Sequence, residues 1–275
     1  MNSNPSKLPQ EFADALAQVR PSLGPLASEV LFYTSVGSTN DIAASLAIAR
    51  EDCEGAVVLA DSQTAGRGRR GHTWFSPEAS GLYVSVVLMP ARTTGSRERA
   101  FSLLTLAAGV ALSEAVQQTT GLTAHIKWPN DLFVERRKLA GILAEAVDGR
   151  PETRNVVLGY GINVGRMSYP PELSTRATSL ETELGRPIDR ADLLAASLVA
   201  LSRRYDDLLA GRFDAILQAW RLRAPWSTGA RVEWDAHGGR CAGVTAGIDD
   251  MGALLVQAGH RTERIVAGEV TWLQM

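Results

Sequence analysis

The chain has 275 residues, of which 45% are hydrophobic and 21% are charged, and its formal net charge at pH 7 is −2. This length and composition are typical of a globular protein with one large domain and one small one. The near-neutral charge argues against a protein that coats nucleic acid. The N-terminal residues are largely polar, and no stretch approaches the roughly 18 apolar residues of a membrane-spanning helix. We therefore expect a cytoplasmic protein that binds neither a membrane nor nucleic acid.

Cysteine and lysine are both scarce. Cys53 and Cys241 are far apart, and neither has a CxxC spacing or a histidine cluster beside it, so we expect no disulfide framework, no zinc site and no redox cofactor. Lysine occurs only at Lys7, Lys127 and Lys138, and every other basic residue is arginine. An ammonium is a compact point charge, unlike a guanidinium, so the lysines retained at 127 and 138 indicate a role that arginine cannot fill. The alternative is that two surface lysines have survived by chance.

The first expected element is a short amphipathic helix over residues 8–19, within an N-terminal helical extension that we assign to residues 1–29. A strand is expected at 30–33 and a helix at 42–49. Three adjacent polar residues precede that helix, namely Ser38, Thr39 and Asn40. They are good helix caps, and the free N–H groups of a helix start can equally meet the polar head of a ligand.

A loop rich in glycine and arginine follows an apolar run at 56–60. The loop extends over residues 63–74 and includes Arg67, Gly68 and Arg69. Glycines let backbone N–H groups approach a ligand, and guanidinium groups match carboxylate and phosphate oxygens two at a time. The loop is therefore a candidate site for a small anion, although a short Gly/Arg segment also occurs in ordinary surface loops.

Strands and helices then alternate up to residue 226. A strand at 81–89 and a long helix at 98–118 come first. Four strands and two helices follow, at 123–128, 132–135, 138–147, 156–162, 191–209 and 213–222. The link between the second and third of these strands is hairpin-sized, which favours antiparallel pairing. We therefore expect an α+β domain over residues 30–226, in which helices pack on a mixed, largely antiparallel sheet.

The C-terminal part differs from the rest of the chain. Short strands separated by glycine-containing turns predict a small antiparallel barrel of SH3-like type over residues 227–275. A barrel of this size is too small to be a catalytic domain of its own. It is either a structural cap or a docking surface for a partner, and the sequence leaves both open.

Five motifs occur in the order that is typical of the bacterial biotin protein ligases. They are Ser38-Thr39-Asn40 and the segments 63–74, 127–131, 137–141 and 159–163. The chain resembles this family over nearly its whole length, including the C-terminal strands, which are similar to the family's SH3-like domain. The resemblance implies the class II synthetase-like fold of the family's catalytic domain.

The activity that the resemblance implies has two steps. Biotin would react with ATP to give biotinyl-5'-adenylate and pyrophosphate, and the biotinyl group would then pass to a lysine of a biotin carboxyl carrier protein domain, as in acetyl-CoA carboxylase. The implied cofactors are ATP and Mg²⁺, with biotin as the substrate. Few residues precede Val30, too few for the DNA-binding domain of larger relatives, so we expect a monofunctional ligase without repressor activity.

The resemblance also assigns roles to individual residues. The biotin-binding residues would be Ser38, Thr39, Asn40, Gln63, Arg67, Gly68, Arg69, Lys138 and Gly141. The ATP-binding residues would be Arg69, Trp74, Lys127, Asn130, Lys138 and Asn163, with Asn163 also near the Mg²⁺ of the nucleotide. The catalytic residues would be Arg67, Arg69 and Lys138, which offset the repulsion between two anions, and Asp131, which would take the proton of the acceptor amine. The alternative for Asp131 is a turn-forming role.

Two other interpretations stay open at this point. A lipoate or octanoate ligase of related fold is the nearer one, but those relatives carry a different Arg/Gly loop followed by a strand with a histidine. An RNA-binding protein with an Arg/Gly segment is the other, and the net charge of −2 disfavours it.

The sequence leaves a homodimer possible through an exposed sheet edge. We also expect the segments 66–72 and 165–171 to close over a bound ligand.

Overall fold

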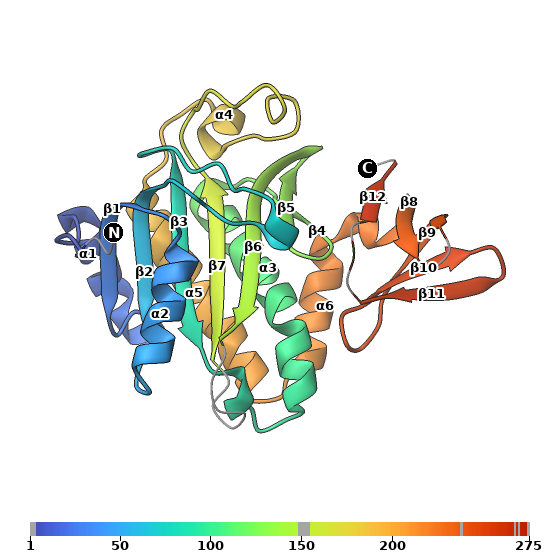
Figure 1. The fold of residues 1–275 in the computed structure, drawn as a ribbon, viewed down its shortest axis with the longest axis horizontal. Helices are drawn as coiled ribbons and strands as arrows, with labels where there is room; N and C mark the ends of the chain where they lie inside the picture. Colours follow the sequence, from blue (N-terminus) through green and yellow to red (C-terminus); the bar gives the residue numbers. More distant parts are fainter. Residues whose placement is uncertain (1–3, 148–154, 237–238, 267, 269, 274–275) are drawn as a thin grey trace.

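We describe the fold from a computed structural model, in which residues 4–147, 155–236, 239–266, 268 and 270–273 are described. The first seven strands are β1 (Val30–Val36), β2 (Val57–Gln63), β3 (Gly81–Leu88), β4 (His125–Lys127), β5 (Asp131–Val134), β6 (Arg137–Ala146) and β7 (Val156–Asn163). They form one sheet in the order β1-β2-β3-β7-β6-β5-β4 (Figure 1). Strands β1 and β2 pair in parallel, and the other neighbouring strands of this sheet pair antiparallel. The predicted mixed, largely antiparallel sheet is therefore confirmed.

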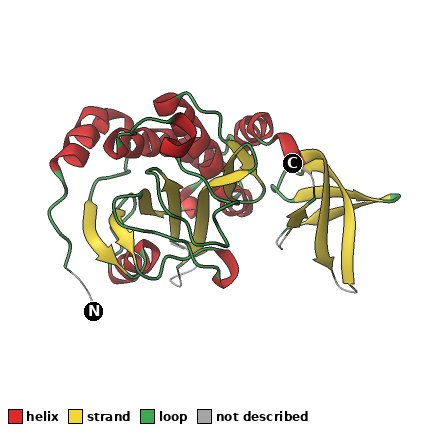
Figure 2. Ribbon diagram, turned by 90° about the horizontal axis from the view of Figure 1, so that it is seen from above, coloured by secondary structure: helices red, strands yellow, loops and turns green. Residues whose placement is uncertain are grey.

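Helices cover both faces of this sheet. They are α1 (Gln10–Val19), α2 (Thr39–Ala49), α3 (Arg97–Thr120), α4 (Leu180–Leu184), α5 (Arg190–Leu209) and α6 (Phe213–Arg223). Figure 2 shows most of them in a layer along one face, whereas α2 lies on the other face. Alternate residues of β2 serve the two cores: Val57 and Leu59 pack with α3 and α5, while Val58 and Ala60 pack with α2. A strand buried on both faces has no polar alternation, which is why β2 reads as a continuous apolar run.

Helix α3 is the central helix of the larger core. Ser96 caps its start by accepting a hydrogen bond from the N–H of Arg99, and Gly121 ends it in the left-handed conformation. By length and composition alone, with a mean hydropathy of 1.4, this helix could cross a membrane. Because 72% of that apolar stretch is buried inside the protein, its apolar character is that of a core helix.

The remaining strands form a second sheet near the C-terminus. They are β8 (Thr228–Ala236), β9 (Gly239–Ile248), β10 (Leu254–Ala258), β11 (Arg261–Ile265) and β12 (Val270–Trp272), in the antiparallel order β11-β10-β9-β8-β12 (Figure 1). The turn before β10 packs against helix α3 and the turn between β4 and β5. Trp128 Nε1 donates a hydrogen bond to the carbonyl of Gly252 at 3.0 Å, and a Cβ at Gly252 would lie only 2.6 Å from Leu106 of α3. The second sheet is thus joined to the first through tight, specific contacts.

One helix was missed by the sequence-based expectation, and another was predicted. Helix α4 was not predicted, because it has only five residues and shows too little periodicity to be recognised. Helix α1 is present as expected, and its Phe12 and Leu16 are buried in the same core as α3 and α5. The amphipathic pattern identified the helix correctly, but it could not say which surface the apolar face would cover.

Candidate active site

A row of paired residues crosses the first sheet and forms the floor of the candidate site. Lys127 of β4 pairs with Asp131 of β5, Asp131 pairs with Gly141 of β6, and Gly141 pairs with Gly161 of β7. Because side chains at paired positions stand on the same face of a sheet, this register brings motifs that are distant in sequence into one line.

A cavity of about 650 Å³ lies over this row. Every residue to which the sequence assigned a role lines it: Ser38, Thr39, Asn40, Gln63, Arg67, Gly68, Arg69, Trp74, Lys127, Asn130, Asp131, Lys138, Gly141 and Asn163. This volume is that of a small-molecule site. The structure therefore brings the motifs together, while the role of each residue stays a proposal.

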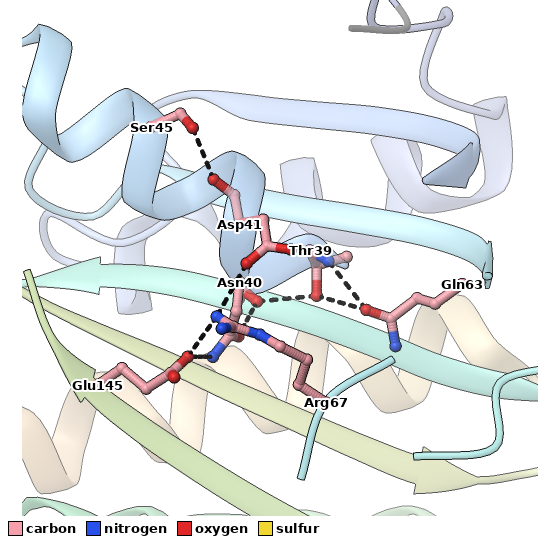
Figure 3. Close-up of polar contacts among 8 residues, drawn as sticks. Thr39, Asn40, Asp41, Ser45, Gln63, Arg67 and Glu145 are labelled. Carbon is pink, nitrogen blue, oxygen red and sulfur yellow. Dashed lines mark hydrogen bonds and ion pairs between the residues drawn. The ribbon is translucent and has the colours of Figure 1, made fainter. Parts of the chain in front are cut away.

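One end of the cavity is a hydrogen-bonded polar cluster at the start of α2 (Figure 3). The backbone N–H and the hydroxyl of Thr39 both donate to Gln63 Oε1, at 2.9 and 3.1 Å. Ser85 of β3 is fully buried and donates to Asn40 Oδ1 at 2.6 Å. Ser38 stands at the cap position of α2 but makes no side-chain capping bond, so simple capping does not account for it. These buried amide and hydroxyl groups suit a polar, uncharged ligand group.

Arg67 connects the glycine-arginine loop to this cluster. Its guanidinium lies 2.9 Å from Asp41 of α2 and 2.7 Å from Glu145 of β6, and Glu145 also accepts a hydrogen bond from Asn40 Nδ2 at 2.8 Å (Figure 3). Sequence reasoning missed Asp41, Glu145 and Ser85. The available signal was weak: Glu145 follows Gly141 by four residues on one strand, and therefore lies on the same face.

The other end of the cavity is basic. Lys138 Nζ lies 2.8 Å from Asp131 Oδ1, an ion pair that lacks the angles of a hydrogen bond. Arg69 donates to Asn130 Oδ1 at 3.3 Å, and burial lowers the pKa of Arg69 from its ordinary value while Asp131 opposes that effect. Burial also lowers the pKa of Lys127, to about 8. Desolvated cations of this kind interact strongly with an incoming anion.

Trp74 packs on the glycine floor. A Cβ at Gly161 would lie 2.3 Å from Trp74 Nε1, and a Cβ at Gly141 would lie 3.0 Å from its ring. Lys138 Nζ lies 5.3 Å from the ring centroid, within cation–π range. The indole Nε1 is buried and has no hydrogen-bond partner among the described residues. The two glycines therefore create the space that this indole fills.

Asn163 lies at the end of β7 and is buried. Its Nδ2 donates to the carbonyl of Thr178 at 2.9 Å, which fixes the orientation of the amide. Asp131 is the one carboxylate among the described residues that line the cavity. A protein cage of several carboxylates is thus not built here, and this donor set fits a magnesium ion that is held largely by phosphate oxygens and water.

Comparisons with known proteins agree with this geometry. Residues 33–163 match the Biotin/lipoate A/B protein ligase family. The chain is 32% identical over 247 residues to the bifunctional ligase/repressor BirA of Bacillus subtilis, covering 89% of this chain and 74% of that protein. It is 32% identical over 252 residues to the biotin–[acetyl-CoA-carboxylase] ligase of Mycobacterium tuberculosis, covering 86% of each.

Solved structures give the same result. The biotin protein ligase of Aquifex aeolicus, solved in complex with biotin and ATP, superposes with a TM-score of 0.76 at 27% identity, covering 90% of this chain and 100% of that one. The similarity thus extends over both sheets, well beyond the segment that carries the motifs. The chain belongs to the biotin protein ligase family.

Proposed function

We propose that the protein activates biotin with ATP and then transfers the biotinyl group to a lysine of a biotin carboxyl carrier protein domain, in acetyl-CoA carboxylase or a related carboxylase. The observation that carries this proposal is the two-ended cavity. One end offers buried, neutral hydrogen-bonding groups for the ureido ring of biotin, and the other offers cations for phosphate. Membership of the biotin protein ligase family supports the same assignment.

Biotin binds with its ureido ring at the polar end. Ser38, Thr39, Asn40 and Gln63 provide donors and acceptors for the N–H and C=O groups of the ring, each of which needs a partner when it is buried. Gly68 and Gly141 allow the backbone to approach the ligand closely. The carboxylate of the valeryl tail then points toward the basic end of the cavity.

The first step joins two anions. A carboxylate oxygen of biotin attacks the α-phosphorus of ATP, the bond from that phosphorus to the bridging oxygen breaks, and pyrophosphate leaves with the electron pair. Arg67, Arg69 and Lys138 offset the repulsion and stabilise the charge that develops on the phosphorus oxygens. Lys127 and Asn130 bind the phosphates and Trp74 packs near the adenine. Mg²⁺ bound to the nucleotide near Asn163 would neutralise further phosphate charge.

The second step requires a neutral amine, although an exposed lysine has a pKa of about 10.4. The acceptor amine attacks the acyl carbon, the bond from that carbon to the phosphate oxygen breaks, and AMP leaves. Asp131 orients the amine and takes its proton. Because a carboxylate is a weak base, stabilisation of the leaving AMP by Lys138 and Arg69 contributes much of the rate.

The partners that follow are biotin, ATP and a carrier protein domain, and a cytoplasmic location is consistent with them. The Biotin/lipoate A/B family name also covers lipoate chemistry, but the Mycobacterium tuberculosis relative and the Aquifex aeolicus structure given above are named as biotin ligases. A lipoyl or octanoyl chain carries no ring of N–H and C=O groups to match the amide and hydroxyl groups at the polar end of the cavity.

Pyrophosphate exchange into ATP tests the proposal directly. We expect exchange with biotin and none with lipoate or octanoate, and Lys138→Ala should lower it by roughly 100-fold or more, the scale of a lost electrostatic group. Lys7→Ala is the matched control, because Lys7 is exposed and lies outside the cavity. Exchange with lipoate would assign the chain to lipoate chemistry, and no exchange with any acid would refute acid activation.

A further inference from the structure

A tryptophan from the second sheet reaches the cavity of the first. Trp272 of β12 lines the cavity, although it lies more than one hundred residues from the other lining motifs. The Lys127 ammonium lies close to two aromatic rings, with its Nζ 4.8 Å from the centroid of Phe133 and 5.8 Å from that of Trp272. Both distances are within cation–π range.

The junction between the sheets is held in place on both sides of this contact. Trp128, the residue after Lys127, donates its indole N–H to the carbonyl of Gly252. On the other side, Trp272 pairs with Val232 in the ladder of β12 and β8. Each partner in the contact between Lys127 and Trp272 is therefore fixed by its own strand or by a neighbouring bond, as a functional contact requires.

We propose that Trp272 is a positioning residue for ATP, which together with Phe133 holds the Lys127 ammonium in an apolar box facing the triphosphate. This inference rests on the proposed function, and it assigns to the C-terminal sheet a part in the nucleotide step. A long lysine side chain loses much rotamer freedom when it binds a phosphate, and contacts with two aromatic rings reduce that loss in advance.

The electrostatics of Lys127 support this placement. Burial lowers its pKa to about 8, Asp131 of β5 opposes the shift, and Lys138 of β6 and Arg176, before α4, add to it. The rings favour the ammonium, and burial disfavours it. An ammonium that has already lost water interacts more strongly with phosphate.

The scarcity of lysine allows a direct measurement. Protein grown with lysine labelled at the side-chain carbon next to the amine gives signals from Lys7, Lys127 and Lys138 only. We expect one signal to titrate near pH 8 and to disappear in Lys127→Arg. In Trp272→Ala water enters, so that midpoint should move upward toward 10.5, whereas Trp272→Phe should keep it near 8. An unchanged midpoint in Trp272→Ala would overturn the inference.

Kinetics supply the second readout. At pH 7, Trp272→Ala should raise the KM for ATP roughly three- to tenfold while leaving the KM for biotin unchanged. The penalty should shrink by pH 9, where wild-type Lys127 has lost its charge and the variant keeps it. Leu273→Ala is the matched control, because Leu273 directly follows β12 and is half exposed. An equal rise in both KM values, or a penalty independent of pH, would indicate general loss of structure and refute a positioning role.

Failure of this inference is distinguishable from failure of the proposed function. If biotin-dependent exchange is present but Trp272→Ala matches Leu273→Ala, only the role of Trp272 is wrong. If wild type shows no exchange with biotin, the function itself is wrong. The variant Trp272→Phe preserves an aromatic ring and is the control for misfolding of Trp272→Ala. If Trp272→Phe keeps the ATP affinity of the wild type and Trp272→Ala does not, the positioning role is supported.

Discussion

Gly161 is the residue whose substitution tests the cavity floor most sharply. In Gly161→Ala the new Cβ would lie 2.3 Å from Trp74 Nε1, closer than real contacts, so the indole must shift. We expect activity to fall about tenfold or more, the scale of a misplaced side chain at a reacting centre. Gly109→Ala in α3 is the control, because its nearest contact is an ordinary 3.5 Å. Equal activity in the two variants would contradict the assignment of this floor.

Asp131 separates the two chemical steps. Asp131→Asn removes the proton acceptor but keeps the shape, so transfer of biotin to a carrier domain should fall by roughly 100-fold, typical of a lost general base. Pyrophosphate exchange should fall much less, because the first step transfers no proton. Glu135→Gln, exposed at the tip of the β5–β6 hairpin, is the control. If both steps fell equally, Asp131 would act through its ion pair with Lys138 instead.

The site residues that could be identified from the sequence differ physically from those that were missed. Gly/Arg and lysine motifs carry a local signature of charge and backbone freedom, so they could be chosen without knowing the fold. Glu145 and Trp272 have no such signature. Their partners Arg67 and Lys127 lie 78 and 145 residues away, and only strand order and register bring them together.

Among the elements, the glycine-arginine loop carries the clearest prediction. The loop is fastened by a bond from Gly68 N to His72 O at 2.7 Å and by the ion pairs of Arg67. A biotin carboxylate competes for Arg67, so ligand binding should rearrange and then close the loop. Trypsin should cleave after Arg67, Arg69 or Arg70 more slowly with biotin plus ATP. Cleavage after exposed Arg212, between α5 and α6, should not change; equal rates at all sites would exclude a closing loop.

Element type was predictable wherever a segment had a long, consistent pattern. Helix α3 and strand β3 were expected almost at their observed bounds, because α3 has apolar residues at helical spacing and β3 is a long, nearly continuous apolar run. The position of β3 between β2 and β7 in the sheet was not predictable, because the pairing of strands that are distant in sequence leaves no local pattern. The fold class was thus accessible from the sequence, but the strand order was not.

At the scale of the whole molecule, Trp128 joins the two sheets. Trp128→Phe leaves the Gly252 carbonyl without its donor, and we expect the free energy of unfolding to fall by about 1–3 kcal/mol, the cost of a buried unsatisfied group. Urea denaturation measures this loss. Trp226→Phe, at the same junction but only partly buried, should cost clearly less. Equal losses in the two variants would mean that the bond to Gly252 contributes nothing.

The paired row from Lys127 through Asp131 and Gly141 to Gly161 has a mechanical consequence. Three strand spacings amount to about 14 Å, so a ligand lying along the row spans four strands at right angles to their direction. Strand β4 lies at the sheet edge and is only three residues long, so a ligand that contacts all four strands should stabilise its pairing most. Amide hydrogens of β4 and β5 should therefore exchange more slowly when the acyl adenylate is bound, while those of β1, at the opposite edge, keep their rates. The bound intermediate would then stabilise the pairing of the strands that bind it, and this stabilisation would be lost when it leaves.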